Sequence, residues 1–146
     1  MDLKGADNLD NFFKGICKKN SLKVTTQRTA IYRELVKTKE HPYAELVYKK
    51  VKGIFPNISF DTVYRTLLTF VNIGLADVIA GSGDPKRFDG NIKKHHHFKC
   101  IKCNNLFDFN FDAYHDIKVP EEIEKQFTIL NSRIIFEGIC NKCSSR

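Results

Sequence analysis

The chain has no tryptophan, one methionine and no apolar run long enough to cross a membrane. Its first ten residues are too polar for a secretory signal peptide. These absences argue against a membrane protein and predict a cytoplasmic one, in which C-x-x-C pairs bind metal more often than they form disulfides. A nucleophile or acid–base motif is also missing, so no enzyme activity is expected. The 146 residues suffice for one domain or two small ones.

Acidic side chains are scarce in the first third of the chain, where residues 18–52 contain 10 basic and 3 acidic residues. The formal net charge of the whole chain is +7. A basic segment of this kind is typical of proteins that bind nucleic acid. It also occurs as a solvated face with no partner. Charge alone leaves both interpretations open.

Apolar spacing predicts four helices before residue 75. Residues 9–17 carry apolar side chains at helical spacing, and Cys17 lies on the face that points into a core. A second helix is expected from residue 25 or 26 to about residue 37. A third should begin at His41-Pro42, because proline suits the first helical position and would place His41 near the N-cap.

The fourth helix has the clearest start, with Ser59 as its cap and Asp61 in its first turn. Its buried stripe is expected at Val63, Leu67, Phe70 and Val71, and Gly74 should end it. The opposite face carries Thr62, Tyr64, Arg65, Thr66 and Thr69. Polar, aromatic and basic side chains on one helical face suit a DNA groove.

Two short strands, residues 75–80 and 86–88, are predicted on either side of a turn at residues 81–85. Helices followed by such a hairpin form a winged helix-turn-helix, and the basic tip at Lys86 and Arg87 would lie near a phosphate backbone. Residues 89–94 are typical of a hinge.

The C-terminal segment is predicted to be a small α/β domain. Alternating Phe107, Phe109 and Phe111 predict a strand with one buried face. A short helix at 120–127 and a strand at 128–138 follow. The fold class is therefore α+β: a winged-helix DNA-binding domain at residues 1–88, a hinge at 89–94, and a dimerisation and metal-binding domain at 95–146. Dimerisation is expected because two half-sites multiply the specificity of a small DNA-binding protein.

Four of the five cysteines form two C-x-x-C pairs, Cys100/Cys103 and Cys140/Cys143. Two such pairs predict one tetrahedral zinc site with four thiolate ligands. A closed site of this type is structural, and it would join the two ends of a domain too small to bury a large core.

A second metal site is indicated just before the first pair. In an extended chain His95 and His97 point to the same side and His96 to the other, while Asp89 and Asp108 lie nearby in sequence. Imidazole and carboxylate ligands suit Fe(II), Mn(II) or Zn(II) better than a thiolate site does. The alternative interpretation is a polar surface patch.

These motifs give the chain a resemblance to the ferric uptake regulator (Fur) family, dimeric metal-dependent bacterial repressors, from about residue 9 to the end. The matching segments are LKVTTQR at 22–28, HP at 41–42, FPNIS at 55–59, TVYRTL at 62–67, RFD at 87–89, HHH at 95–97, GIC at 138–140 and both C-x-x-C pairs. Many separate motifs in the same order make the resemblance specific.

The resemblance implies two kinds of metal site. Structural Zn²⁺ would be held by the four cysteines, and a regulatory Fe²⁺ or Mn²⁺ by five residues, His41, Asp89, His95, His97 and Asp108. Iron-sensing members commonly have glutamate at the positions of Asp89 and Asp108. Aspartate at both resembles the peroxide-sensing branch (PerR), in which a ligand histidine gains oxygen. The implied oxidation targets are His41 and His95.

The function implied is a homodimeric transcriptional repressor that binds a double-stranded DNA operator and responds to oxidative stress through its metal. DNA contacts are expected from Lys23, Tyr64 and Arg65. Arg28 is a further candidate, or it forms a surface ion pair with an acid such as Glu34. The alternatives are an iron-responsive repressor of iron uptake genes, a zinc-stabilised RNA-binding or interaction module and, more remotely, a zinc-stabilised metalloenzyme. The pattern assigns no role to His96 or His115.

Overall fold

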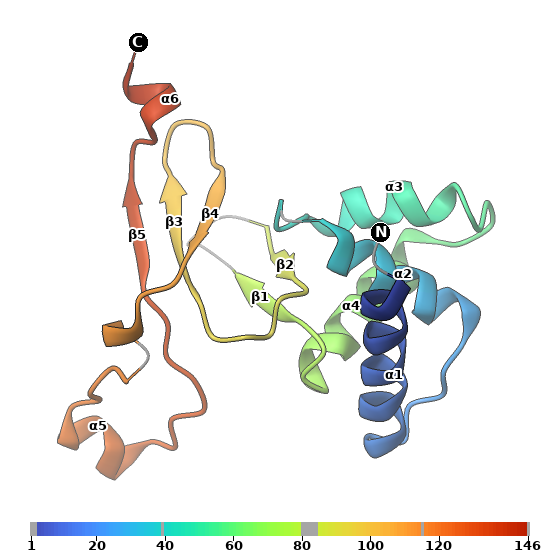
Figure 1. Ribbon diagram of the computed structural model, residues 1–146, viewed down its shortest axis with the longest axis horizontal. Helices are drawn as coiled ribbons and strands as arrows, with labels where there is room; N and C mark the ends of the chain where they lie inside the picture. Colours follow the sequence, from blue (N-terminus) through green and yellow to red (C-terminus); the bar gives the residue numbers. More distant parts are fainter. Residues whose placement is uncertain (1–2, 39, 80–84, 115, 146) are drawn as a thin grey trace. The chain divides into compact units, whose positions relative to one another are not determined.

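The computed structural model describes residues 3–38, 40–79, 85–114 and 116–145. The chain divides into two compact units, unit 1 at Met1–Ile92 and unit 2 at Lys93–Arg146. Unit 1 holds four helices and a two-stranded hairpin, and unit 2 is built on a three-stranded sheet (Figure 1). The mixed α+β class expected from the sequence is confirmed. In the described parts of the chain, no helix is both long and apolar enough to cross a membrane.

The four helices of unit 1 are α1 (Leu3–Lys19), α2 (Thr26–Lys37), α3 (Ala44–Lys52) and α4 (Phe60–Asn72). They enclose a core in which Phe13 stacks on Tyr32 at 4.8 Å between ring centroids and meets Phe70 edge-on at 5.7 Å. Cys17 is fully buried in the same core, as the helical spacing predicts. Leu9 and Phe12, predicted on the same face of α1, are instead 43% and 39% exposed.

Side-chain caps fix the starts of α2 and α4. Thr25 Oγ1 accepts a hydrogen bond from the Arg28 amide at 3.1 Å, and Ser59 Oγ accepts one from the Thr62 amide at the same distance. Each oxygen satisfies an amide that has no partner within its helix. The cap at Ser59 was predicted, whereas for α2 only a start at residue 25 or 26 was expected. One residue of the expected polar face is misplaced, because Thr66 is buried and its hydroxyl donates to the Thr62 carbonyl at 2.7 Å.

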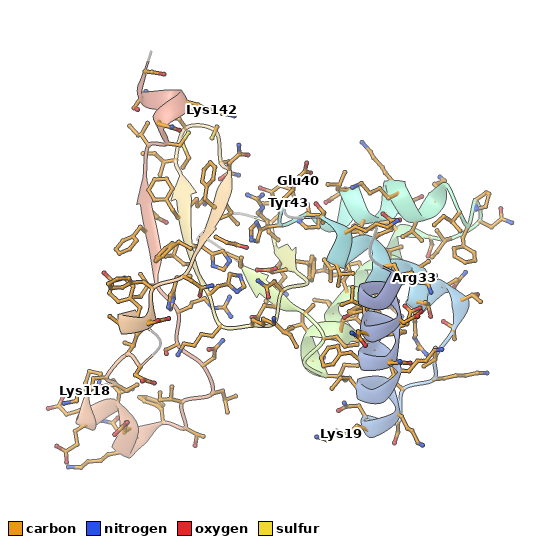
Figure 2. The ribbon with its side chains drawn as sticks, viewed as in Figure 1. Lys19, Arg33, Glu40, Tyr43, Lys118 and Lys142 are labelled. Carbon is orange, nitrogen blue, oxygen red and sulfur yellow. The ribbon has the colours of Figure 1, made fainter. Side chains whose placement is uncertain are left out.

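The start of α3 differs from the prediction. Tyr43, not His41, is the N-cap residue, and His41 lies in the preceding loop with a φ of 52°. This left-handed conformation is uncommon for a residue with a β-carbon and costs on the order of 1–3 kcal/mol unless its surroundings impose it. Figure 2 labels Glu40 and Tyr43, which flank His41-Pro42 in this loop.

The hairpin of unit 1 pairs β1 (Asp77–Ile79) with β2 (Arg87–Asp89) in antiparallel register, with Asp77 opposite Asp89. Gly74, at a φ of 85°, turns the chain out of α4. A left-handed turn after a helix favours glycine. The expected winged-helix arrangement is therefore present, although residues 80–84, most of the predicted turn, lie outside the described residues.

The sheet of unit 2 has the order β4–β3–β5. Strand β3 (His96–Cys100) pairs antiparallel with β4 (Leu106–Phe109) and parallel with β5 (Ile135–Gly138). A 3₁₀ turn, η1 (Asp112–Tyr114), and helix α5 (Glu121–Gln126) lie between β4 and β5, and α6 (Asn141–Ser144) follows. The helix expected at 120–127 is confirmed, whereas α6 was not predicted.

Two expectations for unit 2 are wrong. Residues 128–134 do not extend β5, since the ladder with β3 covers only residues 135–138. The alternating phenylalanines do not form a buried face, because Phe107 is 44% and Phe111 52% exposed within this single chain. The periodicity predicted the strand at Leu106–Phe109 but not the exposure of these side chains.

Candidate metal centres and nucleic-acid interface

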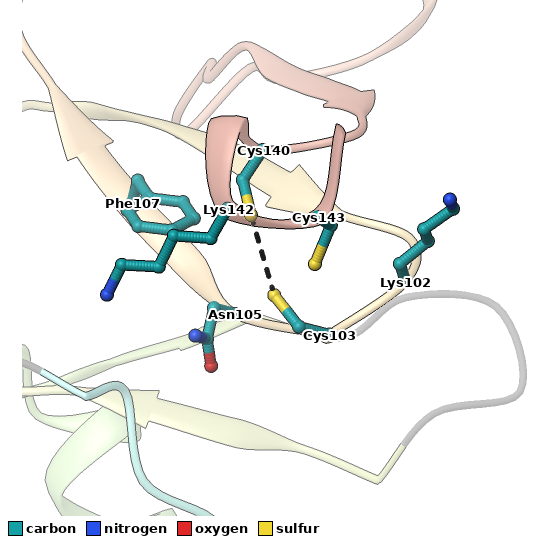
Figure 3. Close-up of a pocket in the computed structure, with 7 residues that line it drawn as sticks. All are labelled: Lys102, Cys103, Asn105, Phe107, Cys140, Lys142 and Cys143. Atoms are coloured by element: carbon teal, nitrogen blue, oxygen red, sulfur yellow. Dashed lines mark hydrogen bonds between the residues drawn. The ribbon is translucent and has the colours of Figure 1, made fainter. Parts of the chain in front are cut away.

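The four cysteines of the two C-x-x-C pairs converge in unit 2. Their sulfur atoms all lie within 4.8 Å of one another. The sulfurs of Cys103 and Cys140 are 3.9 Å apart (Figure 3), and the Cys140 amide donates to Cys100 Sγ at 3.4 Å. The first pair begins at the last residue of β3 and the second spans the start of α6. The cluster therefore joins two segments that are separated by 36 residues.

The surroundings of the cluster favour the thiolate form of Cys100 and the thiol form of Cys143. Backbone hydrogen bonds at Cys103 and Cys140 lower the pKa of Cys100 to about 6. A hydrogen bond with the Cys140 side chain raises the pKa of Cys143 to about 12, so in the metal-free cluster that thiol keeps its proton. Four convergent sulfur ligands match the tetrahedral preference of Zn²⁺, and its charge deprotonates coordinating thiols outright. The residues present therefore fit structural zinc.

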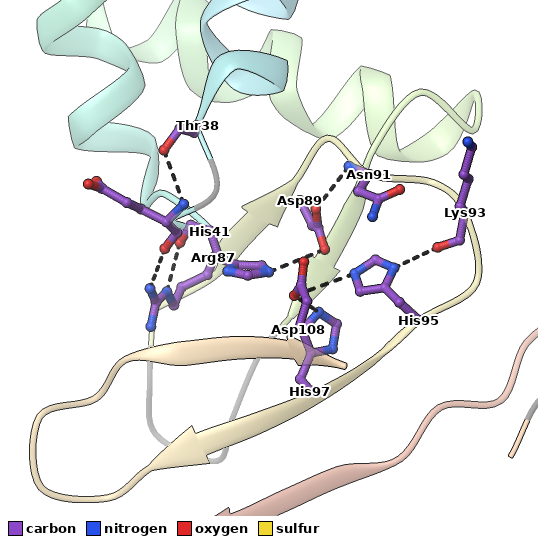
Figure 4. Close-up of polar contacts among 10 residues, drawn as sticks. Thr38, His41, Arg87, Asp89, Asn91, Lys93, His95, His97 and Asp108 are labelled. Carbon is purple, nitrogen blue, oxygen red and sulfur yellow. Dashed lines mark hydrogen bonds and ion pairs between the residues drawn. The ribbon is translucent and has the colours of Figure 1, made fainter. Parts of the chain in front are cut away.

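A second ligand set in unit 2 is made of nitrogen and oxygen atoms. His97 lies directly opposite Asp108 in the β3–β4 ladder, and its Nε2 is 3.3 Å from Asp108 Oδ1. His95, two residues before His97, places its Nε2 3.7 Å from the same oxygen (Figure 4). Both imidazoles are buried. The set combines two imidazoles and one carboxylate, as predicted from the alternation of side chains.

The tautomer of His95 is fixed by the backbone. Its Nδ1 lies 2.6 Å from the carbonyl oxygen of Lys93. A carbonyl can only accept, so this nitrogen carries a proton, and Nε2, the ring nitrogen nearer Asp108, is the one that could bind a metal. A histidine held in this way by its other ring nitrogen is the usual arrangement of a metal ligand.

His96 has a different environment. It is fully buried beside the rings of Phe109 and Tyr114, and its Nδ1 accepts a hydrogen bond from the Ile134 amide at 3.0 Å. The ring therefore links β3 to the segment before β5, and its Nδ1 is committed to that bond. This contact gives His96 a structural role that the sequence pattern did not assign. His115 lies outside the described residues.

Unit 1 carries a smaller set of the same chemistry. His41 Nε2 lies 3.5 Å from Asp89 Oδ2 (Figure 4), and both side chains are buried. Asp89 is the last residue of β2, and its other oxygen, Oδ1, accepts from the Asn91 amide at 2.9 Å. Imidazole and carboxylate donors of this kind suit Fe(II), Mn(II) or Zn(II) better than thiolates do.

The candidate recognition helix α4 presents Arg65 to solvent. Its Nε lies 3.0 Å from Asp61 Oδ2, one turn earlier, and both side chains are mostly exposed. Tyr64 is half-buried, stacked on Phe60 at 6.0 Å and edge-on to Phe88 at 6.5 Å. These contacts fix the tyrosine ring at the surface of the helix.

Two further basic residues lie at the start of α2. Lys23, three residues before α2, is exposed. Arg28 Nη1 donates a hydrogen bond to the backbone carbonyl of Lys23 at 2.7 Å. The ion pair between Arg28 and Glu34 that was kept as an alternative is not formed, since Glu34 Oε1 lies 3.3 Å from Lys37 Nζ. Arg28 therefore shapes the segment that carries Lys23.

Sequence reasoning missed the role of Arg87. Its side chain was expected near a phosphate backbone, but the guanidinium is directed to the loop before α3, where it donates to the carbonyls of His41 and Glu40 at 2.7 and 2.6 Å. The only sequence signal for this role was that Arg87, in a predicted strand, lies two residues before Asp89, so that both side chains point to the same side.

Comparison with known proteins agrees with this geometry. Residues 19–137 match the model of the ferric uptake regulator family. The chain is 31% identical over 126 residues to the peroxide-responsive repressor PerR of Staphylococcus epidermidis, an alignment that covers 86% of this chain and 84% of the relative.

Two solved structures resemble the fold at similar identity. The Campylobacter jejuni peroxide stress regulator has a TM-score of 0.66 at 29% identity, covering 88% of this chain and 97% of its own. The ferric uptake regulator of Pseudomonas aeruginosa with manganese has a TM-score of 0.69 at 25% identity, with the same coverage of both chains. The match over 119 residues, together with these similarities, shows that the chain belongs to the ferric uptake regulator family.

Proposed function

We propose that the protein is a metal-dependent DNA-binding transcriptional repressor that senses peroxide through its regulatory metal. The observation that carries the proposal is the distribution of nitrogen and oxygen ligands: His41 and Asp89 in unit 1, and His95, His97 and Asp108 in unit 2. One Fe(II) or Mn(II) ion bound by all five would link the two units. The names of the relatives, a peroxide-responsive repressor and a peroxide stress regulator, support this assignment.

The proposed division of labour follows the chain. Residues 1–88 form the DNA-binding domain, residues 89–94 the hinge and residues 95–146 the dimerisation and metal-binding domain. An ion held by ligands on both sides of the hinge restricts the angle between the domains and favours the arrangement that fits DNA. A coupling of about 1–3 kcal/mol would raise DNA affinity by roughly 5- to 150-fold.

The DNA contacts are assigned to α4 and the start of α2. Arg65 is exposed on α4 and suited to guanine or phosphate, and Tyr64 offers a ring held by Phe60 and Phe88. Lys23 is exposed, and the hydrogen bond from Arg28 to its backbone carbonyl holds the segment in place. Asp61, one turn before Arg65 on α4, repels phosphate. DNA should therefore bind with its phosphate backbone facing Arg65 rather than Asp61.

The proposed signal is oxidation of a ligand histidine. Ferrous iron held by these residues would supply the electrons that reduce peroxide, and the resulting oxidant would form beside the ligand histidines. His41 and His95 are the proposed targets. Addition of oxygen would modify the His95 ring, whose orientation the Lys93 carbonyl fixes, or the His41 imidazole of unit 1, and the modified ring would be a poorer ligand. Either loss weakens the link between the units and releases DNA.

A peroxide experiment on the two metal forms tests the proposal. Zinc-loaded protein is charged anaerobically with Fe(II) or Mn(II) and mixed with a duplex DNA library, from which the Mn(II) form selects its site. We expect both forms to bind that site, and peroxide to abolish binding of the Fe(II) form alone. Mass spectrometry should find one added oxygen on peptides containing His41 or His95. The substitution Arg65→Ala should weaken DNA binding by both the Fe(II) and the Mn(II) form.

Two other results would point elsewhere. Metal-dependent DNA binding that survives peroxide, with no oxygen on either histidine, would favour the iron-responsive alternative. Binding that ignores added divalent metal would contradict the metal-dependent repressor altogether.

The proposed active form is a homodimer joined through unit 2. Strand β5 lies at an edge of the described sheet, and exposed apolar side chains gather on β5 and the segments beside it. They include Phe127 at 59%, Leu130 at 92%, Phe136 at 46% and Ile139 at 44% exposure. Apolar surface of this kind marks a protein–protein contact. Zinc-loaded protein should therefore sediment at twice the mass of one chain, and a monomer at micromolar concentration would contradict the assignment.

A further inference from the structure

The loop before α3 holds His41 in a backbone conformation that its own sequence does not favour. His41 has a φ of 52°, and the loop carries the only imidazole of the described ligand set in unit 1. A residue with a β-carbon stays in this region only where its surroundings impose it. Contacts from outside the loop must therefore determine where the His41 ring points.

Several such contacts come from one strand, β2. Arg87 Nε donates to the His41 carbonyl at 2.7 Å and Arg87 Nη2 to the Glu40 carbonyl at 2.6 Å. The Phe88 amide donates to the Pro42 carbonyl at 2.9 Å. The Arg87 guanidinium also lies over the Tyr43 ring, 5.0 Å from its centroid. Successive residues of β2 thus bond to successive residues of the loop, as Figure 4 shows for Arg87.

The same strand also supports the His41 ring. Residues two apart in a strand point to one side, so Arg87 and Asp89 lie on the same side of β2. Asp89 Oδ2 is 3.5 Å from His41 Nε2. One strand therefore fixes both the backbone of His41, through Arg87, and the position at which its ring meets a carboxylate.

We propose that Arg87 is a positioning residue for the regulatory metal and acts through His41. The inference rests on the proposed function, because His41 must be a ligand for its position to matter. A charge argument predicts the opposite: a guanidinium near a divalent cation repels it, so removing the guanidinium should strengthen metal binding. If Arg87 positions His41, removing the guanidinium should weaken metal binding. If Arg87 acts only by charge repulsion, removing it should strengthen metal binding.

The contacts at position 87 also require arginine rather than another positively charged side chain. The guanidinium is a planar fork that donates to two carbonyls while stacking on an aromatic ring. The ammonium of lysine is a point donor and cannot reproduce all three contacts at once. Arg87→Lys should therefore restore only part of what Arg87→Met removes.

The test measures Mn²⁺ affinity of full-length, zinc-loaded protein by electron paramagnetic resonance of free Mn²⁺. Arg87→Met should bind roughly 10- to 100-fold more weakly, the range seen when a residue that orients a metal ligand is lost. Lys86→Met is the matched control, since it removes the same charge from the neighbouring exposed residue. It should bind Mn²⁺ as tightly as the wild type, or slightly more tightly.

A double-mutant cycle shows whether Arg87 acts through His41. His41→Asn is the background, because asparagine tolerates the left-handed conformation. If Arg87 acts through the His41 ring, Arg87→Met should cause little further loss in that background. A readout without metal accompanies the cycle: hydrogen exchange of the Phe88 amide should be faster in Arg87→Met than in Lys86→Met.

The outcomes are distinct. Arg87→Met binding Mn²⁺ as tightly as Lys86→Met, or losing the same factor in the His41→Asn background, would overturn the positioning role and leave the proposed function standing. Wild-type protein that binds no Mn²⁺ beyond its zinc, or His41→Asn that binds it normally, would overturn the proposed regulatory site and this inference with it.

Discussion

Cys103→Ser is expected to abolish zinc binding and to unfold unit 2. The Cys103 side chain is exposed, so the change from sulfur to oxygen costs little packing. Its effect comes from the metal, because three thiolates cannot complete the closed tetrahedral site. Structural zinc contributes on the order of 10–16 kcal/mol of apparent binding free energy in small domains near pH 7. Replacing any of the other three cysteines of the cluster is expected to have an effect of the same size.

Unit 2 depends on zinc because it buries little else. Among its described residues, the buried apolar side chains are Cys100, Leu106 and Cys140, and two of these belong to the proposed zinc site. A small domain with so few buried side chains needs a covalent or metal cross-link to offset its conformational entropy. The cluster also closes the sheet at one end, where the Ile101 amide donates to the Gly138 carbonyl at 2.8 Å.

Zinc content and amide hydrogen exchange together measure the effect of Cys103→Ser. We expect almost no bound zinc and loss of protection at the Ile101 amide. Cys17→Ala is the matched control, because it removes a fully buried cysteine from unit 1 and should leave one zinc per chain. The zinc assignment is wrong if Cys103→Ser retains a full equivalent of zinc with unchanged protection in β3 and β5.

The features that sequence predicted are those set by local rules. Ser59 was recognised as a cap because a hydroxyl just before an apolar helical pattern bonds a nearby amide. The cysteine cluster was recognised because the C-x-x-C spacing is itself the local geometry of a zinc ligand pair. Alternation along an extended chain likewise placed His95 and His97 on one side.

The features that sequence did not predict depend on distant residues. The backbone of His41 is set by Arg87, which lies 46 positions away, so the local proline signal misplaced the start of α3. The extent of β5 depends on its pairing with β3, which a pattern within residues 128–138 does not reveal. Phe107 was predicted to be buried because periodicity does not distinguish a core face from an exposed apolar face of a sheet.

Asp108→Asn is expected to disable the regulatory site while leaving the fold intact. Asp108 Oδ1 lies 3.3 Å from His97 Nε2 and 3.7 Å from His95 Nε2, so one carboxylate completes the ligand set of unit 2. Asparagine keeps the shape of the side chain and removes its charge, which makes it a poor ligand for Fe(II) or Mn(II). Loss of a residue that merely orients a ligand costs about 10- to 100-fold in affinity. Loss of a ligand should cost more.

We therefore expect Mn²⁺ affinity to fall by more than about 100-fold in Asp108→Asn, with one zinc per chain retained because the cysteine cluster uses other residues. DNA binding should become weak and insensitive to added Mn²⁺, since no ion then links the two units. Asp116→Asn removes the same charge from an exposed position of unit 2 and should behave as the wild type. If Asp108→Asn still gains DNA affinity with Mn²⁺ as the wild type does, Asp108 is not a ligand. The regulatory metal must then be held by other residues.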